Sequence, residues 1–148
     1  MKHFLLSVSI LITLSASAQS STDSVKSVIT GFFTALKNSD GVALKAYFTD
    51  SAILQTIDTK SGTPRVKTDT PAGFAAMVSR MPQGVADERI TFDVVKIDGD
   101  LASVWTPYQF YLRDKLNHCG ANSFQLVRTG GLWKIQYIID TRRKDCQQ

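Results

Sequence analysis

Few residues in this chain could carry out chemistry, and one histidine is the first to consider. Beyond residue 18 the 148-residue sequence holds a single histidine, His118, and a single glutamate, Glu88. A histidine can act as a base or contact a ligand near neutral pH. It can equally well be held by hydrogen bonds to the backbone or to Tyr111. His118 is therefore the one candidate catalytic residue, and no catalytic set is assured around it.

The same scarcity argues against several other kinds of site. A zinc site needs three or four clustered ligands, and a two-carboxylate glycosidase would have to rely almost entirely on aspartate. Gly130-Gly131 lacks the Lys-Ser/Thr of a phosphate-binding loop. We therefore expect no metal and no cofactor. The run Asp140-Thr141-Arg142-Arg143 could bind an anion, but we interpret it as a strand end with Asp140 paired to an arginine on the exterior.

The first eighteen residues have the pattern of a secretory signal peptide. A basic start is followed by an apolar run from Phe4 to Leu14 and by Ala16-Ser17-Ala18, a small-residue cleavage motif. The run is shorter than the roughly 20 residues of a membrane-spanning helix. In an exported protein two cysteines are more often bridged than free, so Cys119 and Cys146 are expected to form a disulfide.

Cleavage after Ala18 leaves residues 19–148 as one domain, with no linker or repeat to divide it. Loss of Lys2 lowers the net charge from +4 to +3, which is too weak and too scattered for a nucleic-acid interface. We expect a periplasmic or secreted protein that binds no nucleic acid and, once the signal is removed, no membrane.

The last third of the chain predicts a hairpin. Gly130-Gly131 suits a tight turn between strands 118–128 and 133–140. Counting back from this turn places Leu126 opposite Ile135 and Phe124 opposite Tyr137.

Strands are also expected over 90–97 and 101–113, and a turn at Asp114-Lys115 would place Trp105 opposite Phe124 and Tyr111 opposite His118. Because side chains alternate between faces, one face should collect an apolar wall and a polar end, while Asp93 and Asp140 fall on the other face. The predicted ligand-binding residues are Trp105, Gln109, Tyr111, His118, Asn122, Phe124 and Tyr137.

Apolar residues at helical spacing predict three helices before these strands. The first covers about 23–38 with Ser21 or Thr22 as its cap, and the second follows Ser39 or Asp40 and carries Phe48. The third begins at Pro71 after Thr70. The predicted fold class is α+β, with three N-terminal helices packed on a strongly curved antiparallel sheet.

Another apolar group should lie on the outer face of that sheet. It consists of Tyr108, Phe110, Leu112 and Ala121. A face this apolar calls for a cover, and we expect a homodimer formed through it.

Several short motifs resemble one known superfamily. They are Trp105-x-x-Tyr108-x-Phe110, His118-Cys119-Gly120, Phe124-x-Leu126-x-Arg128, Trp133-Lys134-Ile135 and Asp140-Thr141-Arg142-Arg143. With the order of elements, they resemble the nuclear transport factor 2-like superfamily of cone-shaped α+β barrels, and more narrowly its small secreted lumazine-binding subgroup. The superfamily hosts isomerases, dehydratases, hydrolases and binding proteins, so the resemblance implies a fold more than an activity.

Two functional hypotheses follow. The favoured one is an exported domain without catalysis that binds a small, mostly apolar molecule in the cone. The alternative is an isomerase or hydro-lyase that uses His118 with a carboxylate whose position the sequence does not reveal.

Overall fold

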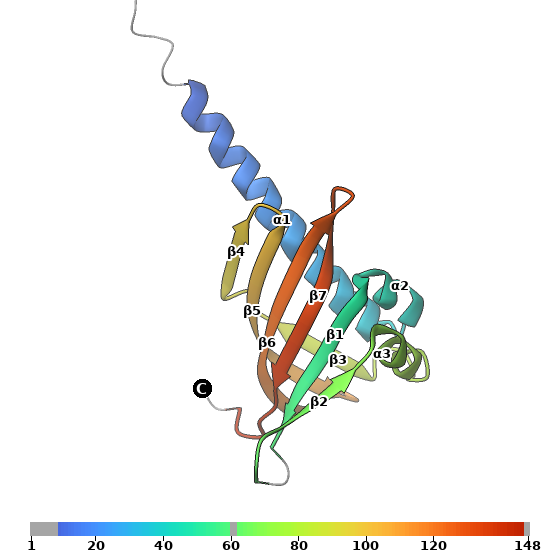
Figure 1. Cartoon of the computed structure of the whole chain (residues 1–148). Coiled ribbons are helices and arrows are strands. Elements are labelled where there is room, and N and C mark those ends of the chain that lie inside the picture. Colours follow the sequence, from blue (N-terminus) through green and yellow to red (C-terminus); the bar gives the residue numbers. More distant parts are fainter. Residues whose placement is uncertain (1–8, 60–61, 147–148) are drawn as a thin grey trace, which may run out of the picture.

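The computed structural model describes residues 9–59 and 62–146, and three helices cover one face of a large curved sheet (Figure 1). This confirms the α+β class. The helices are α1 (Ser9–Lys37), α2 (Gly41–Ala46) and α3 (Pro71–Val78). The strands are β1 (Phe48–Asp58), β2 (Arg65–Asp69), β3 (Ala86–Ile90), β4 (Val94–Asp98), β5 (Leu101–Leu112), β6 (Lys115–Thr129) and β7 (Leu132–Thr141).

The sheet is mixed, which corrects the prediction of a purely antiparallel one. Its strand order is β2-β1-β7-β6-β5-β3, and β4 also pairs with β5. All neighbours are antiparallel except β1 and β7, which run parallel. β2, α3 and β3 to β6 lie between β1 and β7 in the chain, and a connection of this length permits parallel pairing.

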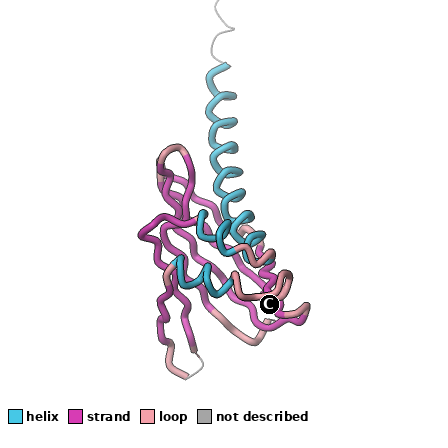
Figure 2. The backbone as a smooth tube through the Cα atoms, turned by 90° about the vertical axis from the view of Figure 1, so that its right-hand side faces the viewer, coloured by secondary structure: helices cyan, strands magenta, loops and turns pink. Residues whose placement is uncertain are grey.

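Helix α1 starts earlier than predicted. It begins at Ser9, runs through Ser21 and Thr22 without a cap, and contains the predicted cleavage point after Ala18. No proline or glycine stands between Ser9 and Gly31 to interrupt the helix. Its N-terminal half extends beyond the sheet, whereas its C-terminal half lies against the sheet (Figures 1 and 2).

The caps of the two shorter helices are as predicted. An oxygen of Asp40 accepts a hydrogen bond from the Ala43 amide at 2.9 Å, and the Thr70 hydroxyl accepts one from the Gly73 amide at 3.0 Å. Phe48 is the exception, because it opens β1 rather than closing α2.

The strand predicted over 90–97 is divided into two. β3 pairs with the second half of β5 and β4 with the first half, while the Thr91 amide donates to the Pro107 carbonyl between them. A single strand could not follow both halves of the curved β5, so the break lets two short strands share one edge.

The predicted register of β5 on β6 is wrong by one residue. The hairpin turn is Arg113-Asp114, two residues with positive φ, and Leu112 pairs with Lys115. A β-bulge at Asn117 then shifts the pairing. Val104, not Trp105, therefore opposes Phe124, and the predicted faces of β5 are exchanged.

The β6–β7 hairpin follows the prediction only near its turn. Gly130 and Gly131 have φ of 59° and 79°, and Leu126 pairs with Ile135 as expected. A bulge at Gln136 then moves the register, so Phe124 opposes Ile138 rather than Tyr137. Asn122 now faces Asp140, which brings that carboxylate to the helix-covered side.

The core lies between α1 and this side of the sheet. Phe124 is fully buried and packs edge-on against Phe32 and Phe33 of α1, with ring centroids 6.3 and 6.0 Å away. Leu126 and Ile135 beside it are also fully buried. Truncation of a buried Phe to Ala typically costs about 3–5 kcal/mol, so Phe124 is mainly a stabilising residue.

Candidate functional site

The seven predicted ligand-binding residues lie on both faces of the sheet. His118, Asn122 and Phe124 face the helices, in register with the inward residues of β5. Trp105 is on the opposite face and 42% exposed, whereas its neighbour Val104 is 3% exposed. The remaining three, Gln109, Tyr111 and Tyr137, share the outer face with Trp105 by strand alternation.

Contacts on the outer face are consistent with this placement. The Tyr111 hydroxyl donates to Gln109 at 3.0 Å, and the Arg89 guanidinium lies 3.9 Å from the centre of the Tyr111 ring. Tyr137 donates to Gln55 at 2.6 Å. Of the polar end predicted for the cavity, Gln109 and Tyr111 therefore lie on the outer surface, whereas His118 and Asn122 face the helices.

Two of the four residues predicted to form a dimer interface lie inside instead. Tyr108 is 5% exposed, and Phe110 is half-buried against the core. They face inward for the same reason that Trp105 faces outward, which is the one-residue register difference. Among the other two, Ala121 faces outward but is buried, while Leu112 is exposed near the end of the hairpin.

An inner cavity of about 240 Å³ lies between the helices and the sheet. Helices α1 and α3 supply an apolar wall, and the strands supply a polar end. The apolar lining comprises Phe32, Phe33, Leu36, Leu54, Phe74, Met77 and Ile138, and the polar lining comprises Gln55, Thr56, Asp69, Glu88, Asn122, Asp140 and Arg142.

The polar end is built from a row of side chains that crosses four strands, which we call the polar row. It consists of Thr56, Asp140, Asn122 and Thr106, each paired in register with the next. One step along the strands, the matching row is Leu54, Ile138, Phe124 and Val104. The inner face thus changes from apolar to polar within two residues of each strand.

Asp140 is the most connected member of the polar row. One carboxylate oxygen accepts a hydrogen bond from the Thr56 hydroxyl at 2.5 Å. The other accepts from Arg142 Nε at 2.9 Å and from the Tyr108 hydroxyl at 3.2 Å. The side chain of Asp140 is only 12% exposed. The ionised carboxylate is therefore held in place by three donors.

Glu88 reaches the polar row from β3. Asn122 Nδ2 donates to Glu88 Oε1 at 2.8 Å and lies 3.4 Å from the Thr106 hydroxyl. Burial raises the pKa of Glu88 to about 7, and the negative charge of Asp140 adds to the rise, while the bond from Asn122 opposes it. Near neutral pH this carboxyl can therefore either hold or release a proton.

Gly120 allows Tyr108 to reach the polar row. A Cβ at Gly120 would lie 1.9 Å from the Thr141 carbonyl oxygen and 2.8 Å from the Tyr108 ring, so only glycine fits. The Tyr108 hydroxyl also donates to that carbonyl at 2.9 Å. Burial, then the charges of Asp140 and Glu88, raise the pKa of the phenol, which remains a donor.

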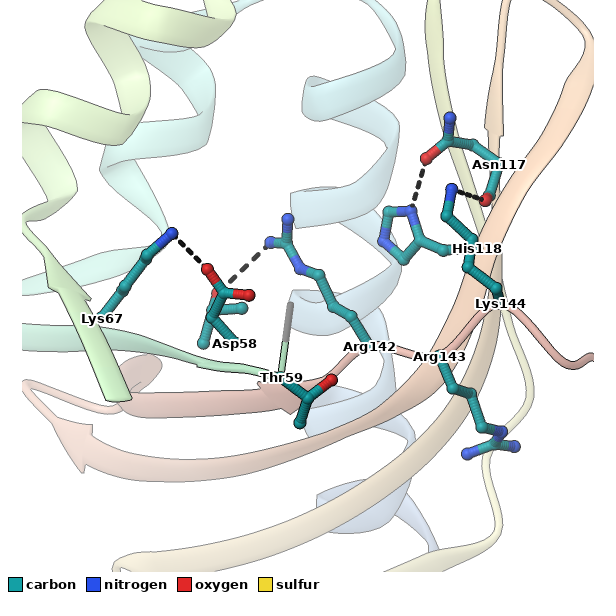
Figure 3. Close-up of a pocket in the computed structure, with 9 residues that line it drawn as sticks. Asp58, Thr59, Lys67, Asn117, His118, Arg142, Arg143 and Lys144 are labelled. Atoms are coloured by element: carbon teal, nitrogen blue, oxygen red, sulfur yellow. Dashed lines mark hydrogen bonds and ion pairs between the residues drawn. The ribbon is translucent and has the colours of Figure 1, made fainter. Parts of the chain in front are cut away.

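His118 lies at a second hollow, which we call the basic groove. This groove has a volume of about 380 Å³ and opens at the end of the sheet (Figure 3). The His118 ring lies 4.8 Å from that of Phe110, and its Nδ1 is 2.9 Å from Asn117 Oδ1. Side chains around the groove include Thr56, Asp58, Lys67, Arg142 and Lys144. His118 does not line the inner cavity.

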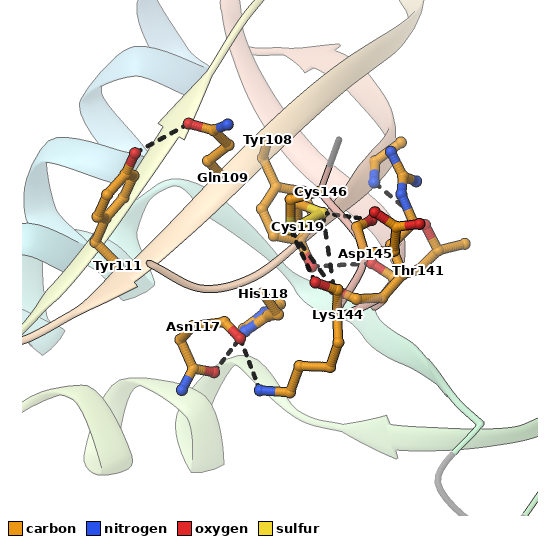
Figure 4. The surroundings of a disulfide bond; sticks show 12 residues. Tyr108, Gln109, Tyr111, Asn117, His118, Cys119, Thr141, Lys144, Asp145 and Cys146 are labelled. Atoms are coloured by element: carbon orange, nitrogen blue, oxygen red, sulfur yellow. Dashed lines mark hydrogen bonds between the residues drawn. A yellow bond between two sulfur atoms is a disulfide. The ribbon is translucent and has the colours of Figure 1, made fainter. Parts of the chain in front are cut away.

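The predicted disulfide between Cys119 and Cys146 is present, with Cα atoms 5.7 Å apart (Figure 4). Beside it, the backbones of Cys119 and Arg143 exchange two hydrogen bonds of 3.1 and 2.9 Å. Together these links fix the segment after β7 against β6. That segment carries Arg142, Arg143 and Lys144 of the groove, whereas Lys67 comes from β2.

Two further findings concern the described residues alone. They contain no group of three or more His, Cys, Asp or Glu side chains placed to hold a metal ion. Within them, no helix has the length and apolar character needed to cross a membrane.

Sequence reasoning missed Glu88 as a site residue and interpreted Asp140 and Arg142 as part of an exterior strand end; the ion pair between them is present, but Asp140 faces inward. A signal for Glu88 exists, because Ala86, Glu88 and Ile90 alternate and would share a face if the strand began at Ala86. Asp140 had no such signal, since its inward direction depends on the bulge at Gln136.

Solved structures of similar architecture exist, although no protein-family model matches the chain and no curated protein sequence is significantly similar to it. An NTF2-like protein of unknown function from Silicibacter pomeroyi is 15% identical, with a TM-score of 0.70 over 85% of this chain and 98% of that one. Another from Shewanella baltica is 14% identical, with a TM-score of 0.67 over 83% and 94%. A Nostoc punctiforme domain of unknown function with a cystatin-like fold is 14% identical, with a TM-score of 0.65 over 84% and 78%. The chain therefore has the nuclear transport factor 2-like, cystatin-like fold.

Proposed function

We propose that this protein binds a small, mostly apolar molecule in the inner cavity. The observation that carries the proposal is the cavity itself, which has an aromatic and aliphatic wall on one side and the polar row on the other. Its volume of about 240 Å³ lies below the roughly 300–1,000 Å³ typical of drug-sized ligands. A compact ligand with a short polar end fits this space.

The two halves of the lining have different tasks in this proposal. Contact with Phe32, Phe33 and Phe74 removes apolar ligand surface from water, which supplies most of the affinity. Asn122 and Arg142 carry N–H donors at the polar end, and Glu88 can donate or accept according to pH. These groups would orient the ligand.

The experiment uses isothermal titration calorimetry to measure the binding of 1-octanol, which serves as the probe. Met77 lines the cavity but is 43% exposed, so Met77→Trp can extend into the cavity without overpacking the core. We expect this variant to lose octanol binding. Val42→Trp is the matched control, because Val42 is 84% exposed on α2 and outside the cavity lining.

Equal binding by Met77→Trp and the unaltered protein would contradict the proposal. Lumazine, the ligand suggested by the subgroup resemblance, is titrated in parallel as a second probe.

Export is part of the proposed function. The signal-like start and the Cys119–Cys146 disulfide support a periplasmic or secreted location, because such compartments are oxidising. Mass spectrometry of the exported protein should show a chain that begins at Gln19. A mature chain that retains Met1 would contradict this part.

A second candidate function is an acid–base enzyme of the isomerase or hydro-lyase type. Glu88 favours it, because a cavity carboxyl with a pKa of about 7 is suited to proton transfer. His118 would not be the base, since it lies at the basic groove.

The test follows deuterium exchange at the α-carbon of cyclohexanone in D2O by NMR. The Glu88 carboxylate would accept the α-proton to leave an enolate, exchange that proton for a deuteron from D2O and return the deuteron to the same carbon. Glu88→Gln should abolish the acceleration, and no acceleration by the unaltered protein would reject this activity for that probe.

We also propose that two copies associate through the outer face of the sheet. The outward residues of β5 between Leu101 and Tyr111 and of β6 between Ala121 and Val127 include no charged side chain. Trp105 lies among them, 42% exposed. An uncharged pair of strands with an exposed tryptophan, bordered by Arg89 and Lys96 on the neighbouring strands, suits a second copy of the same surface. Light scattering should report a dimer that Trp105→Asp converts to a monomer, and a monomeric unaltered protein would contradict this.

A further inference from the structure

The inner cavity and the basic groove share part of their walls. Thr56 and Arg142 line both hollows, although the two are otherwise formed by different residues. On one side of Arg142 the lining is dominated by phenylalanine and aliphatic side chains. On the other side it is dominated by polar and basic side chains. A ligand that reached past Arg142 would therefore meet an apolar environment at one end and a cationic one at the other.

Arg142 is held in a fixed position at this boundary. Its Nε donates to Asp140 at 2.9 Å, and its Nη2 donates to the Thr56 hydroxyl at 3.2 Å. A guanidinium carries five N–H donors in a planar fork. These two contacts therefore leave donor capacity for an anion, and Figure 3 shows the head of the side chain lying between Asp58 and His118.

The charges around the groove favour an anion. Lys67, Arg142 and Lys144 contribute positive charge, against the carboxylates of Asp58 and Asp140, which pair with Lys67 and Arg142 respectively, so the balance remains positive. Lys144 Nζ donates to the Asn117 carbonyl at 2.7 Å, which holds it beside His118. Like-signed charges around a hollow concentrate ions of the opposite sign. Arg143 also borders the groove, but its side chain points away from Arg142 and His118 (Figure 3).

We propose that the ligand is an amphipathic monoanion, such as an alkyl or aryl carboxylate, with its apolar part in the inner cavity and its anionic group in the basic groove against Arg142. This inference rests on the proposed function and names the ligand class for the same site. The carboxylate would receive N–H donors from Arg142, and Lys144 would add charge from the opposite side. The apolar part would displace water from the wall formed by α1 and α3.

The experiment compares octanoate with 1-octanol, which share a tail and differ in the charge of the head. Both are titrated by calorimetry at low salt into the full exported chain. We expect octanoate to bind at least tenfold more tightly than octanol. Arg142→Gln should reduce this preference to less than twofold, because octanoate loses a charged partner whereas octanol loses at most a neutral hydrogen bond.

Arg143→Gln is the matched control, since it removes the same charge one residue away from a side chain that points out of the groove. It should preserve the preference for octanoate. If Arg142→Gln fails to fold, Lys144→Gln replaces it, with an expected loss of about threefold in octanoate affinity alone. Thermal denaturation of each variant establishes that it is folded.

The possible outcomes separate the two proposals. Octanol binding as tight as octanoate binding would overturn the anionic class, while the apolar cavity ligand would stand. An equal loss of the octanoate preference in Arg142→Gln and Arg143→Gln would show that a diffuse positive potential, rather than a site at Arg142, attracts the anion. That result would also overturn the anionic class. Failure of both probes to bind would reject the proposed function together with the inference.

Discussion

The inner cavity and the basic groove meet at Arg142 but are held by different forces. The cavity is enclosed by α1, α3 and the buried side of the sheet, so hydrophobic packing fixes its wall. The groove depends on the short segment after β7, which a disulfide and two backbone hydrogen bonds fasten to Cys119. One region is therefore part of the core, and the other is an edge held by a covalent link. The two halves of the site can therefore be perturbed separately.

Reduction of the disulfide should cause the largest loss of stability, and it should impair binding in the basic groove but not in the inner cavity. Cys119 and Cys146 are 27 residues apart, and closing such a loop contributes about 3.5 kcal/mol to the free energy of unfolding in the chain-entropy model. Urea unfolding with and without reductant measures this loss. Below the unfolding transition, the reduced protein should still bind octanol but lose its preference for octanoate.

A Cys119→Ser/Cys146→Ser double variant serves as the control and should not respond to reductant. A reduced protein that kept the full octanoate preference would show that the groove does not depend on the covalent link.

Glu88 should make the stability of the cavity depend on pH. Its folded-state pKa of about 7 lies above the ordinary 4.5, so the folded protein holds this proton more tightly than the unfolded chain. The resulting stability is full below about pH 4.5 and is lost as the pH rises through 7. The total is at most about 3 kcal/mol, from 1.36 kcal/mol for each unit of pKa difference.

Urea unfolding between pH 4.5 and 8 measures this dependence, and Glu88→Gln should remove the decline over that range. Identical pH profiles for the variant and the unaltered protein would mean that Glu88 titrates normally.

Asp140→Asn tests, from the cavity side, the wall that the inner cavity shares with the basic groove at Arg142. The change weakens three hydrogen bonds to a charged acceptor and should lower the free energy of unfolding by about 2 kcal/mol. Because the charge of Asp140 raises the pKa of Glu88, the pH-dependent loss of stability should also move to lower pH. Asp93→Asn is the control, since Asp93 is exposed outside the polar row. No movement of the pH transition would argue that the two carboxyls are uncoupled.

Thr56→Val should have the smallest effect, because it alters only the shared wall. The variant keeps the shape of the side chain but loses the donation to Asp140 and the acceptance from Arg142. We expect a loss of about 1 kcal/mol in urea unfolding, typical of one hydrogen-bonded group. Thr91→Val, at an exposed position between β3 and β4, should change stability by less. A weaker octanoate preference in Thr56→Val alone would confirm that this wall orients Arg142.

Local features of the fold could be predicted well from the sequence. Asp40 and Thr70 cap their helices, and Gly130-Gly131 forms its turn, because each depends on residues within four positions. The predicted start of α1 is wrong for a related reason. A residue that is suited to an N-terminal cap does not mark the beginning of a helix when no proline or glycine interrupts the chain before it.

The face of each strand could not be predicted with the same success. An error of one residue at the Arg113-Asp114 turn, together with the bulge at Asn117, exchanged the two sides of β5. The bulge at Gln136 did the same for the second half of β7. Bulges accommodate the curvature of the whole sheet and have no dependable local signature. Trp105 and Tyr137 were therefore expected inside, and Tyr108 and Asp140 outside.

The α+β class, the three helices, the hairpins and the pairing of Cys119 with Cys146 could all be predicted without the structure. Each follows from periodicity, short-range hydrogen bonding or the count of cysteines. The meeting of Glu88, Asn122 and Asp140 at the end of an apolar cavity is visible only in the folded chain. Their meeting depends on the register between strands far apart in the chain, and the parity of side chains converts a shift of one residue into a change of face.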